Sequence, residues 1–182
     1  MSDKIGKIEI ITGCMFSGKS EELIRRLKRA RIAKLRVQIF KPVIDIETYS
    51  GEKFQSDVIS HSQDILNQLS ENIQVIGIDE AQFYDMEITN VVREIASKGI
   101  RVIIAGLDMD FRGEVFGPMG NLMAIADEVT KLHAICTVCG EEATMTQRII
   151  NGKPAHYSDP VVLIGASEKY EARCKLHHEV VK

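Results

Sequence analysis

A glycine-rich stretch near the start of the chain has the residue types and spacing of a phosphate-binding loop. The sequence GCMFSGKS fits the pattern G-x-x-x-x-G-K-[ST] and lies between an apolar run and a helix-like stretch, a context that argues against a chance match. Glycines let successive backbone N–H groups point at one anion, and the N-terminus of the following helix adds positive potential. We therefore expect a nucleoside triphosphate here, with Lys19 at the β- and γ-phosphates and the Ser20 hydroxyl on Mg²⁺. The loop consists of Gly13, Cys14, Met15, Phe16, Ser17, Gly18, Lys19 and Ser20.

Two adjacent carboxylates follow a second apolar run, residues 73–79. In proteins with such a phosphate loop, an acid at the end of a neighbouring strand holds the Mg²⁺ shell. Asp79 suits that role. Glu80 is then free to act as a general base on the group that accepts the phosphoryl group, or on a water.

Two pairs of metal-ligating residues lie near the end of the chain, in CTVCG and in CKLHH. Two such pairs separated by a loop are typical of a tetrahedral zinc site with three thiolates and one imidazole. A redox C-x-x-C is the main alternative, but it leaves the second pair unexplained. His178 could compete as the fourth ligand, although its spacing is one residue too long, and Cys14 is interpreted as a small packing residue. The expected ligands of a structural Zn²⁺ are Cys136, Cys139, Cys174 and His177.

The metal would join the two ends of the loop 140–173. A loop closed in this way loses less entropy when it orders over a ligand. Val161, Leu163 and Tyr170 could then line a lid. A surface β-hairpin whose apolar residues pack on the main domain is an equally good interpretation of the spacing alone.

These residues need a scaffold, and the remaining pattern predicts an α/β fold. Short β-branched runs alternate with amphipathic helices, which is typical of a mostly parallel sheet with crossover helices, here a P-loop, RecA-like one. We expect strands over residues 7–12, 36–41, 57–60, 73–79 and 100–107, and helices over residues 19–34, 64–69 and 86–98. The composition changes after residue 131, so we expect a nucleotide-binding domain over residues 1–131 and a zinc-binding domain with a lid over residues 132–182.

Composition limits the possible functions. The 182 residues are 45% hydrophobic and 27% charged, as in ordinary globular proteins, and suffice for one α/β domain with a small appendage. A net charge of −3 argues against a dedicated nucleic-acid binder, and the basic stretch after the phosphate loop is interpreted as the solvated face of a helix. From the sequence we expect neither a signal peptide nor a membrane span, and the four cysteines indicate a reducing compartment, so we expect a cytoplasmic protein.

Taken together, these motifs resemble the type II, zinc-containing thymidine kinases. The matching segments follow the family's order: GCMFSGKS, IDEAQF, GLDMDFRGEVFG, CTVCGEEATMTQR and GASEKYEARC. The resemblance implies ATP-dependent transfer of the γ-phosphoryl group to the 5′-hydroxyl of thymidine, and of deoxyuridine, in DNA precursor synthesis. It also implies a homotetramer and feedback inhibition by thymidine triphosphate.

The family pattern also assigns individual residues. It implies that Glu80 is the general base, beside the Mg²⁺-associated Asp79, and that backbone groups of the zinc-stapled loop read the pyrimidine edge, which favours the lid. It implies that Arg148 positions that loop. The implied base pocket consists of Met15, Phe83, Leu107, Phe111, Phe116, Thr146, Val161, Leu163 and Tyr170.

One segment departs from the family pattern. Members commonly carry Asp-x-Arg-Tyr after the second strand, whereas this chain has KPVIDIETYS, with Thr48 where arginine is usual and Asp45 available for the acidic role. The arginine's role is therefore not carried over. Two other functions fit the phosphate loop: an ATPase that moves nucleic acid through its zinc unit, and a non-catalytic nucleotide-binding regulator.

Overall fold

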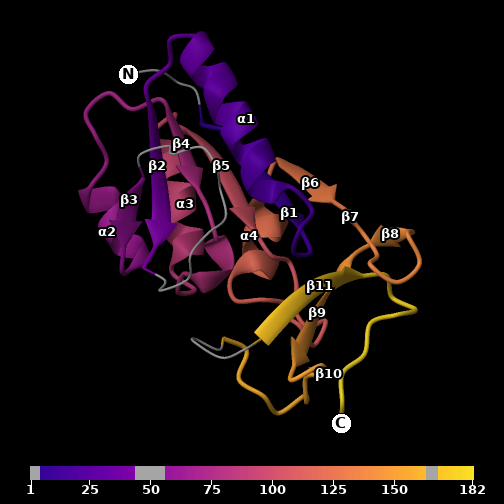
Figure 1. Cartoon of the computed structure of the whole chain (residues 1–182). Coiled ribbons are helices and arrows are strands. Elements are labelled where there is room, and N and C mark those ends of the chain that lie inside the picture. Colours follow the sequence, from indigo (N-terminus) through magenta and orange to yellow (C-terminus); the bar gives the residue numbers. More distant parts are fainter. Residues whose placement is uncertain (1–4, 44–55, 163–167) are drawn as a thin grey trace.

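The computed structural model describes residues 5–43, 56–162 and 168–182, and a parallel sheet forms the centre of this part of the chain (Figure 1). The strand order is β3-β2-β4-β5-β1-β6, and every neighbouring pair runs parallel, which confirms the predicted fold class. The strands are β1 (Ile8–Gly13), β2 (Val37–Pro42), β3 (Asp57–Ile59), β4 (Val75–Ile78), β5 (Arg101–Gly106) and β6 (Glu128–Leu132).

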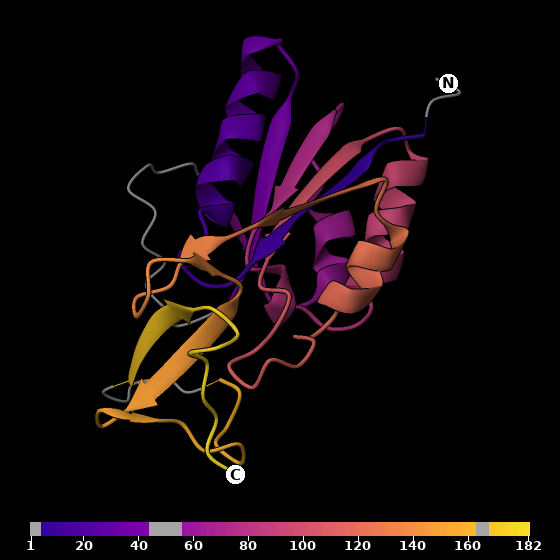
Figure 2. The same cartoon turned by 90° about the vertical axis from the view of Figure 1, so that its right-hand side faces the viewer.

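Helices cover both faces of this sheet (Figure 2). The helix α1 (Lys19–Ile32) lies on one face, where Leu23, Leu27 and Ala30 pack against the strands. Gly77 of β4 permits this approach, because a Cβ atom there would lie 2.7 Å from a Leu27 methyl carbon. The opposite face carries α2 (Ser62–Asn67), α3 (Ile88–Ser97) and α4 (Met119–Ile125), and a short 3-10 helix, η1 (Ala81–Phe83), follows β4.

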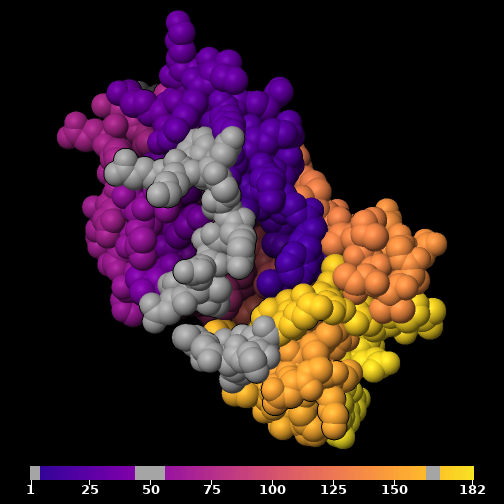
Figure 3. Space-filling model, in the orientation of Figure 1, coloured from indigo at the N-terminus to yellow at the C-terminus, as the bar shows by residue number. Residues whose placement is uncertain are grey.

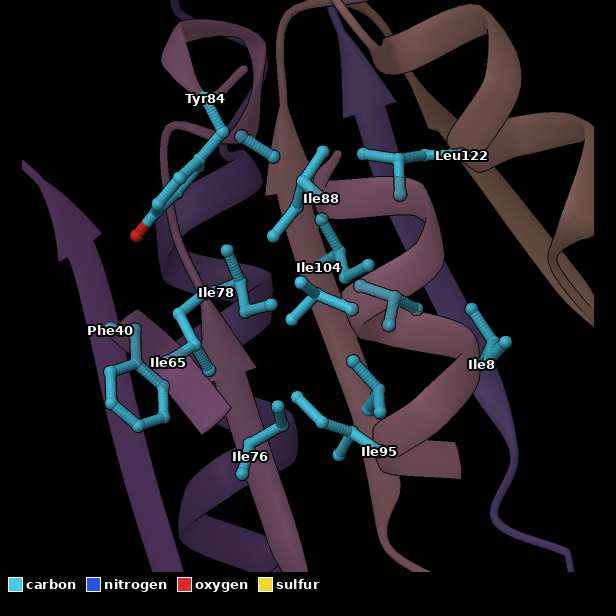
Figure 4. Close-up of a cluster of buried hydrophobic side chains, with 14 of the residues drawn as sticks. Ile8, Phe40, Ile65, Ile76, Ile78, Tyr84, Ile88, Ile95, Ile104 and Leu122 are labelled. Atoms are coloured by element: carbon cyan, nitrogen blue, oxygen red, sulfur yellow. The ribbon is translucent and has the colours of Figure 1, made fainter. Parts of the chain in front are cut away.

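The larger hydrophobic core lies between the sheet and α3. Figure 4 shows Ile76, Ile78 and Ile104 pointing from the strands toward Ile88 and Ile95 of α3. All five side chains are fully buried. Because alternate residues of a strand point to opposite faces, each central strand contributes to this core and to the smaller one beneath α1. The double burial explains the continuous apolar runs that identified the strands.

The sequence did not predict α4 or β6. The strand β6 has the polar sequence EVTKL and pairs only with β1 at the edge of the sheet, so it lacks the apolar run of a doubly buried strand. The helix α4 has seven residues, too few for a clear helical period.

A small antiparallel region follows the sheet, where the sequence predicted a small C-terminal unit but not its strands. It contains the two-stranded pair β7 (Ala134–Ile135) and β8 (Glu142–Ala143) and the three-stranded sheet β10-β9-β11, formed by β9 (Met145–Ile150), β10 (Lys153–Pro154) and β11 (Glu168–Arg173). This region lies below the carboxyl ends of the parallel strands in Figure 1, and in Figure 3 yellow atoms of β11 adjoin indigo atoms of the N-terminal segment.

Among the described residues, no helix combines the length and hydropathy needed to cross a membrane.

Candidate active site and metal centre

The predicted phosphate loop joins β1 to α1 at the carboxyl edge of the sheet. Gly13 and Gly18 have φ values of 142° and 84°, in the region that favours glycine, so the loop needs them for its path. Lys19 folds back into the loop, and its Nζ donates to the Cys14 carbonyl oxygen at 2.7 Å. Burial lowers the pKa of Lys19. Gly18 provides no side-chain cap to α1, so the first N–H groups of this helix are available to an anion.

The two residues predicted to bind Mg²⁺, Ser20 and Asp79, lie in contact. The Ser20 hydroxyl donates to Asp79 Oδ1 at 3.3 Å, and the Asp79 side chain is buried. Hydroxyl and carboxylate oxygens are hard ligands of the kind that Mg²⁺ prefers, so the two residues present fit this ion.

A further cation, Lys41, lies beside Asp79. Its Nζ is 3.6 Å from Asp79 Oδ2, because β2 runs beside β4 and the two strands end together. Burial raises the pKa of Asp79, and the Lys41 charge opposes that rise. Lys41 was not among the predicted site residues. Its position as the last charged residue of a neighbouring strand was the available signal.

Glu80 leaves the end of β4 with a left-handed backbone, at φ 53°. Its N–H donates to Asp79 Oδ1 at 3.0 Å, and its carboxylate accepts from the Gln82 amide. Burial and the neighbouring Asp79 charge raise the pKa of Glu80. The two carboxylates therefore point to different partners, although they are adjacent in sequence.

The four predicted zinc ligands form one cluster, with their ligand atoms all within 4.8 Å of one another. The Cys139 and Cys174 sulfur atoms are 3.8 Å apart, and His177 Nδ1 lies 3.2 Å from Cys174 Sγ and 3.8 Å from Cys136 Sγ. A tetrahedral site with Zn–S bonds of about 2.3 Å places its sulfur atoms about 3.8 Å apart, so this set fits zinc. His178 lies outside the cluster, where its Nε2 contacts the Phe111 carbonyl oxygen at 2.8 Å.

Most of the described residues predicted for the base pocket fall into three groups, and Leu107 lies outside them. Phe83 and Phe116 pack edge to face, with ring centroids 5.4 Å apart. Met15 donates its N–H to Thr146 Oγ1 at 3.1 Å. Leu107 donates its N–H to Gln82 Oε1 at 2.9 Å. Its backbone is therefore joined to Gln82, the residue that donates to the Glu80 carboxylate.

Arg148 organises the third group. Its guanidinium lies 4.2 Å from the Phe111 ring centroid, and its Nε donates to the Tyr170 hydroxyl at 3.0 Å. The same guanidinium donates to the carbonyl oxygens of Pro160 and Val161. Leu163, Asp45 and Thr48 lie outside the described residues.

The phosphate loop and the metal-binding region are in direct contact. Besides the hydrogen bond between Met15 and Thr146, the buried Cys14 thiol donates to the Ala143 carbonyl oxygen at 3.3 Å. Cys14 also packs with Ala134 and Ala172 of the antiparallel region. Cys14 is therefore a buried packing residue of this interface, as its small side chain suggested.

A loop with the phosphate-binding pattern, a Ser20–Asp79 hydrogen bond beside it and a separate Glu80 carboxylate are typical of a phosphotransferase of the P-loop class. Residues 6–178 match the family model described as thymidine kinase. The match spans nearly the whole chain, and the protein belongs to the thymidine kinase family. It is therefore a phosphotransferase that phosphorylates thymidine, with ATP as the substrate that the family implies.

Proposed function

We propose that the enzyme transfers the γ-phosphoryl group of ATP to the 5′-hydroxyl of thymidine with Glu80 as the general base. The observation that carries the proposal is the position of Glu80 directly after Asp79, with a carboxylate that accepts from Gln82 and not from Lys19 or Lys41. A hydroxyl becomes a better nucleophile when a carboxylate within hydrogen-bond reach takes its proton.

The phosphate loop supplies the electrostatic part of the reaction. Lys19 exchanges its contact with the Cys14 carbonyl for the β- and γ-phosphates, and the loop N–H groups bind the same oxygens. Ser20 and Asp79 would hold Mg²⁺, which would neutralise charge on the phosphates.

The nucleoside base would bind between the aromatic residues of the main domain and the loop that Arg148 holds. Arg148 donates hydrogen bonds to the carbonyl oxygens of Pro160 and Val161, and it therefore fixes the backbone next to the proposed nucleoside site. We infer that backbone groups of the loop 140–173 read the pyrimidine edge, with Met15, Phe83, Leu107, Phe111, Phe116, Thr146, Val161, Leu163 and Tyr170 as the lining. Deoxyuridine is then a second substrate.

We infer that the metal is a structural zinc. All four ligands are protein side chains, which leaves no open coordination position for catalysis. Desolvation opposes ionisation of Cys136, but backbone hydrogen bonds from Cys174, Cys139 and Val138 outweigh it and lower the pKa of this thiol to about 6. A thiolate is the form that binds zinc.

Other expectations extend the proposal and rest on the family resemblance or the sequence. They are a homotetramer, inhibition by thymidine triphosphate, a cytoplasmic location, and division of the chain into domains over residues 1–131 and 132–182. The division into two domains is supported by the position of β6, because this strand ends at Leu132, before all four metal ligands in the sequence.

The substitution Glu80→Gln tests the base directly. It keeps the size of the side chain but removes its basicity, so we expect turnover to fall by about 10²–10⁴-fold, with ATP–Mg²⁺ affinity within about twofold. The exposed Glu87 offers a matched control, because Glu87→Gln makes the same chemical change away from the site. A Glu80→Gln enzyme that keeps the parental turnover, with chemistry shown to limit the rate, would overturn the assignment.

A further inference from the structure

Gln82 joins the proposed general base to the loop that follows β5. It lies in η1 and is 3% exposed. Its Nε2 donates to Glu80 Oε2 at 2.6 Å, and its Oε1 accepts from the Leu107 N–H at 2.9 Å. Both ends of one buried amide are therefore engaged.

The first of these hydrogen bonds selects the reactive oxygen of Glu80. An ionised carboxylate only accepts hydrogen bonds, and its two oxygens are chemically equivalent until a partner distinguishes them. Gln82 occupies Oε2, and no second donor to this carboxylate is found within residues 5–43, 56–162 and 168–182. Oε1 is therefore the oxygen left to take a proton.

The second hydrogen bond fixes where that carboxylate lies relative to the nucleoside pocket. Leu107 is a residue of the proposed pocket, and its backbone N–H sets the position of the Gln82 amide. The surroundings leave the amide little freedom, because a Cβ atom on Gly106 would lie 2.9 Å from Gln82 Oε1. A displacement of Leu107 would therefore move the Glu80 carboxylate with it.

We propose that Gln82 is a positioning residue for the reaction: it orients the Glu80 carboxylate and sets its distance from the nucleoside site. The inference rests on the proposed function, since it takes Glu80 to be the base. Misplacement of a reacting group by about 1 Å can cost about 100-fold in rate. Loss of the Gln82 amide should therefore reduce turnover without reducing binding of ATP, whose site is formed by other residues.

The substitution Gln82→Glu tests the hydrogen bond to Glu80. Glutamate keeps the shape and can still accept from Leu107, but it cannot donate to Glu80 when ionised. We expect kcat to fall by about 10–100-fold, while KM for ATP–Mg²⁺ stays within about twofold. Gln82→Asn, which keeps an uncharged amide but is too short to reach both partners, should lower kcat in the same way. Thermal unfolding of each variant checks that the fold is intact.

A double-mutant cycle with Glu80→Gln decides whether the effect acts through Glu80. Single-turnover formation of thymidine monophosphate from radiolabelled ATP measures the slow variants. In the Glu80→Gln background, Gln82→Asn should change the rate by less than about threefold, because neither residue then carries a carboxylate to be oriented. An equal loss in both backgrounds, or parental kcat in both Gln82 variants, would overturn the positioning role alone. Parental activity of Glu80→Gln itself would overturn the proposed base and this inference with it.

Discussion

Asp79 and Glu80 show how two adjacent carboxylates acquire different roles from their surroundings. Asp79 contacts the Ser20 hydroxyl and lies near the Lys41 ammonium group. Glu80, in contrast, accepts a hydrogen bond from the neutral amide of Gln82. The left-handed backbone at Glu80 turns its side chain away from the direction that the strand would give it. One residue of the pair can therefore face a metal ion while the other faces an acceptor hydroxyl.

Arg148 leads to a prediction about nucleoside binding. Arg148→Lys keeps the charge but loses the planar fork that reaches the Pro160 and Val161 carbonyl oxygens and the Tyr170 hydroxyl together. We expect KM for thymidine to rise by about 10-fold or more, while KM for ATP–Mg²⁺ changes by less than about twofold. Steady-state kinetics with each substrate varied in turn measures both values.

The control for this change is Lys169→Met, on the same strand as Tyr170, where the side chain is 73% exposed. It should leave both KM values near those of the parent. A rise in the KM of ATP equal to that of thymidine would contradict a specific role of Arg148 in the nucleoside site.

At the scale of elements, the phosphate loop and the antiparallel region share hydrogen bonds, and this contact leads to a prediction for the metal site. Cys174→Ser removes one of the four ligands, so zinc content should fall well below one per chain. The region after β6 should become sensitive to protease, while the parallel sheet stays folded, because its cores contain no residue of the cluster. Metal analysis, limited proteolysis and thermal unfolding measure these effects.

The substitution Thr137→Ser provides the matched control, because Thr137 is adjacent to the ligand Cys136 but is not one of the four metal ligands. Thr137→Ser should keep the zinc and the protease resistance of the parent. Full zinc content in Cys174→Ser, or cooperative unfolding of the whole chain on zinc loss, would contradict this account.

The elements differ in how far the sequence predicted them. The buried strands and α1 carry long apolar patterns, and their predicted positions are confirmed to within a few residues. The edge strand β6 carries no such pattern, because only β1 pairs with it and its side chains are mostly exposed. Its place beside β1 depends on tertiary contacts that a local pattern does not contain.

The residues of the candidate site also differ in how far the sequence predicted them. Residues in short contiguous motifs could be predicted, because each motif has its own local pattern: Lys19 and Ser20 lie in GCMFSGKS and Asp79 in IDEAQF. Lys41 and Gln82 were not predicted, because their contacts depend on which strand lies beside β4 and on how η1 turns. The metal cluster was predictable although its two halves are far apart in sequence, because each half carries its own short motif.

At the scale of the whole molecule, Glu9 joins α1, β1 and β5 through buried ion pairs. Its carboxylate accepts from Arg26 at 2.8 Å and from Arg101 at 2.7 Å, and Lys7 lies 3.8 Å away. Burial raises the pKa of Glu9, but the hydrogen bonds and charges of Arg101 and Arg26 outweigh burial and leave the pKa below its ordinary value. The charged form is therefore the one that stabilises the fold.

This arrangement predicts a pH dependence of stability. A carboxyl group with a depressed pKa contributes its full stabilisation above the unfolded-state pKa of about 4.3, and that contribution is lost as the pH falls through the lower folded-state value. Glu9→Gln should cost about 2 kcal/mol at pH 7 and flatten the loss of stability below about pH 4.5. Urea unfolding across this pH range measures both. The exposed Glu94 pairs with Lys98, and Glu94→Gln should change neither by more than about 0.5 kcal/mol. An unchanged slope in Glu9→Gln would contradict the assignment.

The most direct test of the account is the comparison of kcat/KM for four deoxynucleosides at saturating ATP–Mg²⁺, with the monophosphate product measured. Thymine and uracil present an N3–H donor beside an O4 acceptor, and cytosine reverses both, which leaves buried polar groups unpaired at about 1–3 kcal/mol each. The thymine methyl group adds about 1 kcal/mol of apolar contact. We predict that thymidine is phosphorylated best, deoxyuridine less well, and deoxycytidine and deoxyadenosine hardly at all. Equal values for deoxycytidine or deoxyadenosine and thymidine, or DNA-stimulated ATP hydrolysis without any nucleoside monophosphate, would contradict the account.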